Sequence, residues 1–426
     1  MDQISDDAAV LQHLTEQGTL DTRPSRRVSS WALPSVGGGS VSAPRTVPPR
    51  ETLGGTLGSH AARQALRLCE AAGLNGADSA SYARTLLAAL GPVAERSLDL
   101  PPPEHSFLSD DHSPVEFSLS FVAHAEPTLR VLLEPGYGAG SLAENGRTGL
   151  RVVREMAGRW GFDTKGLDEL EDLFFPPNPQ GPLALWCALE LLPGGIPKIK
   201  VYLNPAASGQ ERSAETVREA LRRLGHRKAF TALPQGDRHL FFALDLGSWE
   251  EPRVKVYLAH HDLTAAEAAG LSRVDGGPGE TEVTTFFRMA AGHVPDLDDL
   301  DVEDGRIARP RRRPVQSCHA FTETATGRPS GFTLYVPIRD YARHDGEALD
   351  RALAVLGRHG MDTAPLVRSL SAATSRDLRD GVGLIAYVGL AHQLGRPPRV
   401  TVYVSSEAYE VRPPVVSPPV EAAVAR

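Results

Sequence analysis

Three short stretches of the chain repeat one arrangement of basic residues and tyrosine. Residues 198–203 read KIKVYL, 253–258 read RVKVYL and 399–404 read RVTVYV, while 333–338, TLYVPI, is a looser fourth copy. Polar and apolar residues alternate with period two, which predicts a strand with two different faces. Fixed Lys and Arg groups stabilise negative charge, and tyrosine ring faces stabilise positive charge. The polar face is therefore suited to a charged ligand; the alternative is a face that directs Lys and Arg into bulk water.

The tyrosine distinguishes these two interpretations. On the polar face it returns at the same offset in each copy, in the sets Lys198, Lys200 and Tyr202; Arg253, Lys255 and Tyr257; and Arg399, Thr401 and Tyr403. The opposite face is apolar, as in Ile199, Val201 and Leu203. A face that only meets solvent gives no reason for this recurrence, so we favour a binding site.

Composition limits the class of protein. The chain has 426 residues, a net charge of −8, 41% hydrophobic and 23% charged residues, which is typical of a globular protein with two domains or one large barrel. The negative charge argues against a nucleic-acid partner. No stretch approaches the ~20 apolar residues of a membrane span, and the first residues, MDQISDDAAV, lack the pattern of a signal peptide. We expect a cytoplasmic protein without a membrane partner.

No metal site is predicted. The three cysteines are far apart in the sequence, at Cys69, Cys187 and Cys318, so they indicate neither a disulfide framework nor a zinc site. His260 and His261 are adjacent, and neighbouring residues on a strand point in opposite directions. The acidic run 296–304, DLDDLDVED, is interpreted as a solvated loop rather than a magnesium site.

The elements that position the repeated face are five pairs of strands separated by helices. The strand pairs are predicted within 114–134, 183–203, 240–258, 319–338 and 383–405. Helices are predicted at 59–72, 78–90, 148–160, 164–174, 213–225, 281–292, 345–359 and 361–373. Short turns make each pair antiparallel. The prediction is an α+β fold, a ten-stranded antiparallel β-barrel ringed by helices, wide enough for a solvent-filled lumen lined by the polar face.

A TIM barrel is the alternative fold. It needs parallel strands with a helix after each one, and the short turns at 193–195 and 247–252 argue against it. Residues 1–50 are rich in Ser, Pro, Gly and Arg and are expected to form a disordered or loosely attached arm. We expect residues 51–410 to form a single barrel domain and residues 411–426 a C-terminal tail.

Six segments resemble the bacterial branch of the aromatic prenyltransferases of the dimethylallyltryptophan synthase type. The resemblance covers roughly residues 50–410 and rests on PVEFSLSF, LRVLLEP, KIKVYLNP, RVKVYLAHHD, GFTLYVPIRDY and RVTVYVSSEAY. It implies the PT barrel, or ABBA fold, built from five αββα units. It also implies transfer of a dimethylallyl group from dimethylallyl diphosphate to the indole ring of L-tryptophan. The reaction is a metal-independent Friedel–Crafts substitution that releases diphosphate, and it needs no cofactor beyond this co-substrate. We expect these small molecules as partners, and a monomer or homodimer.

The resemblance also implies roles for residues at matching positions. The diphosphate is expected to contact Arg130, Lys200, Arg253, Lys255 and Arg399. A shield of tyrosines around the allylic cation is expected from Tyr202, Tyr257, Tyr335, Tyr387 and Tyr403. The catalytic candidate is Glu116, which would accept a hydrogen bond from the indole N–H and help to remove the ring proton.

Three positions depart from the family pattern. Leu192 stands about where fungal members that alkylate indole C4 carry a Lys, Asn204 stands where a further ring is usual, and Thr333 replaces a Gln. The Leu192 position argues against C4 chemistry, and C6 is the predicted ring carbon. The alternatives are another aromatic acceptor (another indole, tyrosine or a polyphenol), or a non-catalytic barrel that binds an anionic aromatic or a prenyl diphosphate.

Overall fold

The computed structural model describes residues 55–247, 249–292 and 313–415. The predicted N-terminal arm at 1–50, the acidic run at 296–304 and residues 416–426 of the predicted tail lie outside the described residues. Within residues 411–415 the chain follows the barrel domain, because the Val382 N–H donates to the Arg412 carbonyl at 3.0 Å and the Val415 N–H donates to the Arg343 carbonyl at 2.8 Å.

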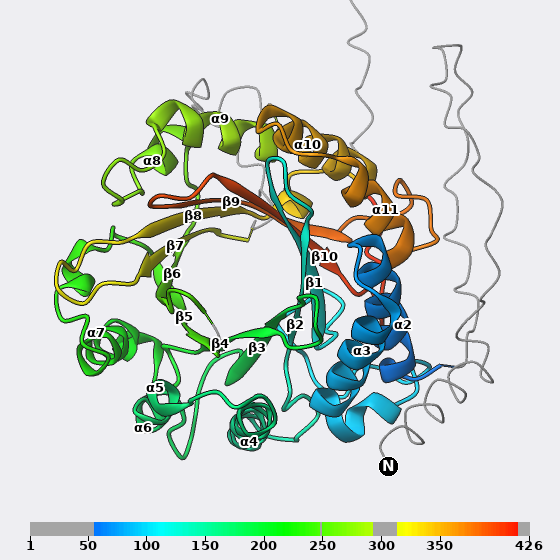
Figure 1. Cartoon of the computed structure of the whole chain (residues 1–426), viewed down its shortest axis with the longest axis horizontal. Helices are drawn as coiled ribbons and strands as arrows, with labels where there is room; N and C mark the ends of the chain where they lie inside the picture. The colour runs from blue at the N-terminus through cyan, green and yellow to red at the C-terminus, as the bar shows by residue number, and fades with distance from the viewer. Residues whose placement is uncertain (1–54, 248, 293–312, 416–426) are drawn as a thin grey trace, which may run out of the picture.

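Ten antiparallel strands close into a barrel (Figure 1). The strands are β1 Val115–Val122, β2 Thr128–Leu133, β3 Leu185–Glu190, β4 Lys198–Leu203, β5 Arg238–Leu246, β6 Val254–His260, β7 Val315–Phe321, β8 Gly331–Val336, β9 Ile385–Gln393 and β10 Arg399–Ser405. Neighbours in sequence are neighbours in the barrel, and β10 closes it against β1. The predicted ten-stranded antiparallel barrel is therefore confirmed.

Helices surround the barrel (Figure 1). They are α2 Leu57–Ala71, α3 Gly76–Leu90, α4 Leu142–Trp160, α5 Lys165–Asp168, α6 Glu171–Phe174, α7 Ser213–Arg223, α8 Ala265–Ala269, α9 Glu280–Ala291, α10 Asp345–Arg358 and α11 Ala364–Ala373. The helix predicted at 164–174 is two short helices, and α8 was not predicted. Among the helices of the described ranges, none has both the length and the apolar character that crossing a membrane requires.

The hairpin turns all lie at the same end of the barrel, because consecutive strands alternate in direction. We call this the hairpin end; it holds residues 123–127, 191–197, 247, 249–253, 322–330 and 394–398. The opposite end, where the helices connect one pair to the next, is called the crossover end. In the turn from β3 to β4, Gly194 and Gly195 have φ values of 97° and 72°, which glycine adopts without a steric penalty.

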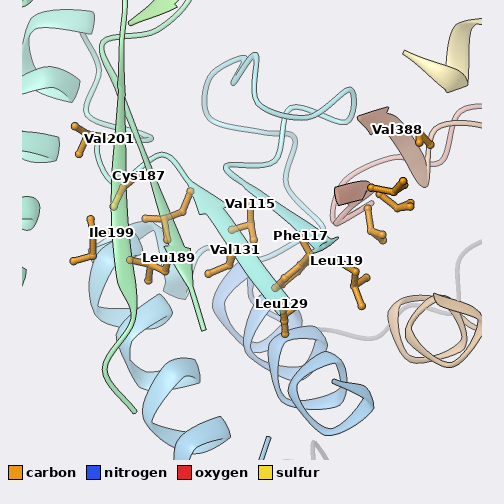
Figure 2. Close-up of a cluster of buried hydrophobic side chains, with 14 of the residues drawn as sticks. Val115, Phe117, Leu119, Leu129, Val131, Cys187, Leu189, Ile199, Val201 and Val388 are labelled. Carbon is orange, nitrogen blue, oxygen red and sulfur yellow. The ribbon is translucent and has the colours of Figure 1, made fainter. Parts of the chain in front are cut away.

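The apolar core lies between the barrel and the helices. Figure 2 shows Phe117, Leu119, Leu129 and Val131 directed from β1 and β2 toward the helices, and each is at most 3% exposed. Burying one such side chain contributes roughly 1.5–3 kcal/mol. A shift of the strand register by one residue would turn all of these apolar side chains into the lumen. The apolar face therefore fixes the strand orientation, and the polar face must line the interior.

A buried carboxylate joins α10 to the start of β9. The Asp345 side chain is fully buried and accepts hydrogen bonds from the backbone N–H groups of Gly383 at 3.0 Å and Ile385 at 3.1 Å. Arg376 forms an ion pair with its other oxygen. These contacts set the residue at which β9 begins, and hence the position of its lumen residues along the barrel axis.

Candidate active site

The lumen side chains are arranged in layers along the barrel axis. β4, β6 and β10 run inward from the hairpin end, and each carries a Tyr four residues beyond a basic residue at its start or just before it: Tyr202 after Lys198, Tyr257 after Arg253 and Tyr403 after Arg399. At about 3.3 Å per residue, four residues correspond to about 13 Å. The cations therefore lie near the hairpin end and the tyrosines lie deeper.

Two carboxylates hold three of the predicted diphosphate-binding residues. Arg130 donates to Glu190 through Nε at 2.8 Å and Nη2 at 2.6 Å. Two strands further around the wall, on β5, Asp245 accepts from Arg253 Nε at 2.6 Å and lies 3.6 Å from Lys200 Nζ. Burial opposes the ionised form of Asp245, but Lys200, Lys255 and Arg253 outweigh it and hold its pKa at about 2. The carboxylates keep these cations in place and neutralise part of their charge.

The other two predicted cations have no such partner. Within the described residues, Lys255 makes no ion pair or hydrogen bond, and the buried Arg399 Nε has no hydrogen-bond partner. Burial, followed by the nearby Lys200 and Arg253, lowers the pKa of Lys255 well below its ordinary value. Burial and the neighbouring Arg130 and Arg253 lower the pKa of Arg399 to about 10. This wall therefore favours the arrival of a polyanion.

Two cavities that share several lining residues lie beside these cations. The outer one, of about 330 Å³, opens at the hairpin end and is lined by Arg253, Lys255 and Arg399. The inner one, of about 40 Å³, is lined by Arg130, Lys200, Lys255, Arg399, Tyr202, Tyr335 and Tyr403. Trp249 lines both cavities, with its ring centroid 4.9 Å from Arg253 Cζ and 5.7 Å from Lys200 Nζ. A ligand can therefore place its anionic part at the mouth and its remainder in the inner cavity.

All five predicted shield tyrosines belong to one continuous series of rings. The centroid distances are 5.7 Å for Tyr202–Tyr257, 6.0 Å for Tyr257–Tyr335, 5.9 Å for Tyr335–Tyr403 and 6.4 Å for Tyr403–Tyr387. The series crosses the lumen from β4 to β9, so a cation in the inner cavity would face several rings. Burial raises the pKa of every one of these hydroxyl groups, so they remain neutral at physiological pH.

A glycine makes room for this series. Gly389 on β9 pairs with Tyr335 on β8, and a Cβ atom at Gly389 would lie 2.8 Å from Tyr335 Cδ1. Any other residue would push the Tyr335 ring away from its place between Tyr257 and Tyr403.

Glu116 lies beyond the tyrosines, toward the crossover end. It pairs with Ser405, whereas Ser118 pairs with Tyr403 and Val122 pairs with Arg399 at the hairpin end. The side chain is 95% buried. Burial raises its pKa to about 8; Arg339 opposes the shift, and Asp110 and Asp111 add to it. A carboxyl group poised near neutral pH suits proton transfer.

The three departures from the family pattern have different places in the structure. Leu192 lies in the turn from β3 to β4, where its carbonyl accepts from the Tyr82 hydroxyl at 2.5 Å. Asn204 is a structural residue, because its amide donates to the carbonyls of Gln180 at 2.8 Å and Leu183 at 3.1 Å. Thr333 lines both cavities.

Four residues of the site were not predicted. Glu190 and Asp245 lie on the lumen faces of β3 and β5, and strand alternation alone could have placed them there. Trp249 lies in a turn, and Arg339 follows β8 within the motif GFTLYVPIRDY, in which the sequence pattern indicates no role for this residue. In the part of the chain that the structure describes, no three His, Cys, Asp or Glu side chains are grouped to hold a metal ion.

Comparison with known proteins agrees with this geometry. Residues 80–366 match the family model of tryptophan dimethylallyltransferase. The solved structure of PriB in its binary complex with product diphosphate is 60% identical, covers 85% of this chain and 99% of its own, and has a TM-score of 0.80. The 5-dimethylallyl tryptophan synthase from Streptomyces coelicolor, solved with DMASPP and Trp, is 62% identical, with coverage of 86% and 99% and a TM-score of 0.79.

A third solved structure is more distant. The 6-dimethylallyltryptophan synthase from Micromonospora olivasterospora is 40% identical, covers 84% of this chain and 99% of its own, and has a TM-score of 0.74. The ten-stranded barrel, the layered lumen and these matches lead to one conclusion: the chain belongs to the tryptophan dimethylallyltransferase family, whose members are prenyl-transferring enzymes.

Proposed function

We propose that this enzyme transfers a dimethylallyl group from dimethylallyl diphosphate to C6 of the indole ring of L-tryptophan, without a metal ion, and releases diphosphate. The observation that carries the proposal is the unbroken series of five tyrosine rings directly beneath a cluster of partly unpaired cations. Neither a simple anion site nor an apolar pocket requires both layers.

The cations would promote departure of the leaving group. When the allylic C–O bond breaks, its electron pair goes to the diphosphate, which leaves with about three negative charges. The five predicted cations carry five formal positive charges, and Glu190 and Asp245 neutralise two of them through Arg130, Lys200 and Arg253, which leaves a formal excess of three among these side chains. Because these charges are fixed and largely buried, they stabilise the developing anion more strongly than water would. The free Lys255 and Arg399 are the groups that gain most from its arrival.

The tyrosines would stabilise the allylic cation. Each ring face contributes roughly 0.5–2 kcal/mol to a nearby cation, and more where water is excluded. The inner cavity of about 40 Å³ has room for little water beside a ligand, which limits capture of the cation as an alcohol. The raised pKa values of the hydroxyl groups keep phenolate nucleophiles out of the site.

Glu116 would act on the acceptor. It accepts a hydrogen bond from the indole N–H, which orients the ring and increases its electron density. The C6–C1 bond forms with a pair of ring π electrons, and the arenium intermediate then loses its C6 proton. The Glu116 carboxylate takes this proton directly or through water, because its pKa of about 8 makes it a competent base near neutral pH.

The ring position is the finer part of the proposal. The absence of a Lys at Leu192 supports another benzenoid carbon over C4, and both a 5- and a 6-dimethylallyltryptophan synthase are among the similar solved structures. We retain C6, with C5 as the alternative.

Because the three cysteines are all buried and unpaired, they are compatible with action in the cytoplasm.

The test is an assay in EDTA with dimethylallyl diphosphate and L-tryptophan, read by product mass and by NMR. We expect a mono-dimethylallylated tryptophan substituted at C6. Substitution at C5 would overturn the ring assignment alone. No product with tryptophan or other aromatic acceptors, with or without added Mg²⁺, would overturn the transferase proposal in favour of a non-catalytic barrel.

A further inference from the structure

One aromatic ring at the hairpin end lies among three basic side chains. Trp249 is in the turn from β5 to β6, is partly buried and lines both cavities. The centroid of its ring lies 5.2 Å from Lys198 Nζ, 5.7 Å from Lys200 Nζ and 4.9 Å from Arg253 Cζ. All three distances fall within the ~6 Å over which a ring face attracts a cation. Each of the three cations also lines at least one of the two cavities, so the ring belongs to the donor side of the site.

The end of a strand ladder fixes the position of this ring. Ile199 on β4 and Leu246 on β5 form the outermost pair of their ladder at the hairpin end. The Trp249 indole N–H donates to the carbonyl groups of both residues, and each Nε1–O distance is 2.9 Å. A carbonyl at the end of a ladder still needs a donor, so these bonds stabilise the turn and hold the ring against the wall. The backbone therefore places the ring independently of the cations around it.

The cations around the ring repel one another. Asp245 pairs with both Arg253 Nε and Lys200 Nζ, so one carboxylate balances two positive charges. Burial lowers the pKa of Lys200; Asp245 opposes this shift, and Arg253 adds to it. The negative face of an aromatic ring attracts cations, and, unlike a carboxylate, it does not occupy their N–H donors. The Trp249 ring therefore offsets part of the repulsion and leaves these donors available to an anion.

We propose that Trp249 is a positioning residue of the donor site: its ring keeps Lys198, Lys200 and Arg253 beside one another at the place where the diphosphate leaves. This inference rests on the proposed function. A further carboxylate at this position would neutralise the wall and compete with the diphosphate, whereas an indole keeps the full positive charge in place. Loss of the ring would let the three side chains separate, and it would weaken donor binding without changing acceptor binding.

The test compares Trp249→Leu, which removes the ring, with Trp249→Phe, which keeps a ring face but loses the indole N–H. At saturating L-tryptophan, we expect kcat/KM for dimethylallyl diphosphate to fall about thirtyfold in the Leu variant and about threefold in the Phe variant. The dissociation constant of inorganic diphosphate, measured by calorimetry, should rise in the same order, and KM for L-tryptophan should stay unchanged. An equal loss in both variants would overturn the proposal, because they share only the loss of the N–H.

The matched control is Trp160→Leu. Trp160 lies on α4, outside the barrel, and its ring centroid is 5.3 Å from Arg159 Cζ. The variant therefore also removes a partly buried indole beside a cation, but away from the lumen. It should leave both donor measurements at their wild-type values, and a loss equal to that of Trp249→Leu would overturn the proposal.

Tryptophan fluorescence gives a direct readout of the ring. Diphosphate should change the emission of the wild-type enzyme, because the emission of an indole responds to the charges around it. We expect this change to be lost in Trp249→Phe and kept in Trp160→Phe. A change that persists in full in Trp249→Phe would overturn the proposal, because the anion would then bind away from this ring.

Diphosphate binding needs no turnover, so it separates failure of this inference from failure of the proposed function. If the wild-type enzyme forms no prenylated product but binds diphosphate, and if Trp249→Leu weakens this binding far more than Trp249→Phe, the transferase proposal fails and the positioning role stands. If product forms and Trp249→Leu binds diphosphate as the wild type does, the transferase proposal stands and the positioning role is wrong. If the Leu variant does not fold, Trp249→Met, which has a longer side chain but no ring, gives the same comparison.

Discussion

The proton balance at Glu116 gives a quantitative prediction. In the wild-type enzyme, we expect kcat/KM for L-tryptophan, measured at saturating donor, to rise with pH and to level off above about pH 8. The sign follows from the raised pKa: burial keeps the carboxyl protonated below about pH 8, and only the deprotonated form can accept the arenium proton. With a pKa of about 8, the active fraction grows about tenfold between pH 7 and pH 9.

The perturbation is Glu116→Gln. The amide keeps an oxygen that accepts from the indole N–H but cannot take up a proton, so turnover should fall about 10²–10⁴-fold and lose its rise with pH. Ser120→Ala is the control, because Ser120 lies on the same face of β1, 3.1 Å from the Thr401 hydroxyl, and should keep the wild-type profile. A wild-type inflection near pH 5, or a Gln variant that retains the rise near pH 8, would refute the reasoning.

Three further outcomes are expected. Lys255→Met removes an unpaired donor-side cation and should lower kcat/KM for dimethylallyl diphosphate by about 10²–10³-fold in steady-state assays, with little change in L-tryptophan binding by calorimetry. Gly389→Ala should displace the Tyr335 ring and increase the ratio of dimethylallyl alcohol to prenylated tryptophan, measured by chromatography; an unchanged ratio would contradict the shielding role. Asp345→Ala leaves Arg376 and two backbone N–H groups unpaired, so denaturant unfolding should show a loss of about 3–5 kcal/mol.

Much of the fold could be predicted from local pattern. The alternation in KIKVYL, RVKVYL and RVTVYV indicated strands with unlike faces, and the short turns indicated antiparallel hairpins. The differences are local as well. Residues 164–174 form two short helices because the first stops at Asp168, and the five residues of α8 are too few to show a helical period.

The candidate site was predictable only in part. Most of the basic residues and tyrosines could be named because they repeat within short stretches, whereas Arg130 and Tyr387 were named through the family resemblance; the structure places them in one lumen. Arg339 does not repeat, and Asp110 lies far from it in sequence, so no local pattern connects them. Glu190 and Asp245 follow the alternation of their strands, but their pairing with Arg130 and Lys200 depends on strand register.

The sequence by itself determined which face of each strand is apolar, and therefore which side chains must face the lumen. This information is local, because period-two alternation is a property of a few consecutive residues. The tertiary structure decided which of these side chains meet. Closure of β1 against β10 brings Glu116 beside Ser405, and it also removes the lumen side chains from water. The loss of hydration, with the charges that closure brings near, raises the pKa of Glu116 and lowers that of Lys255.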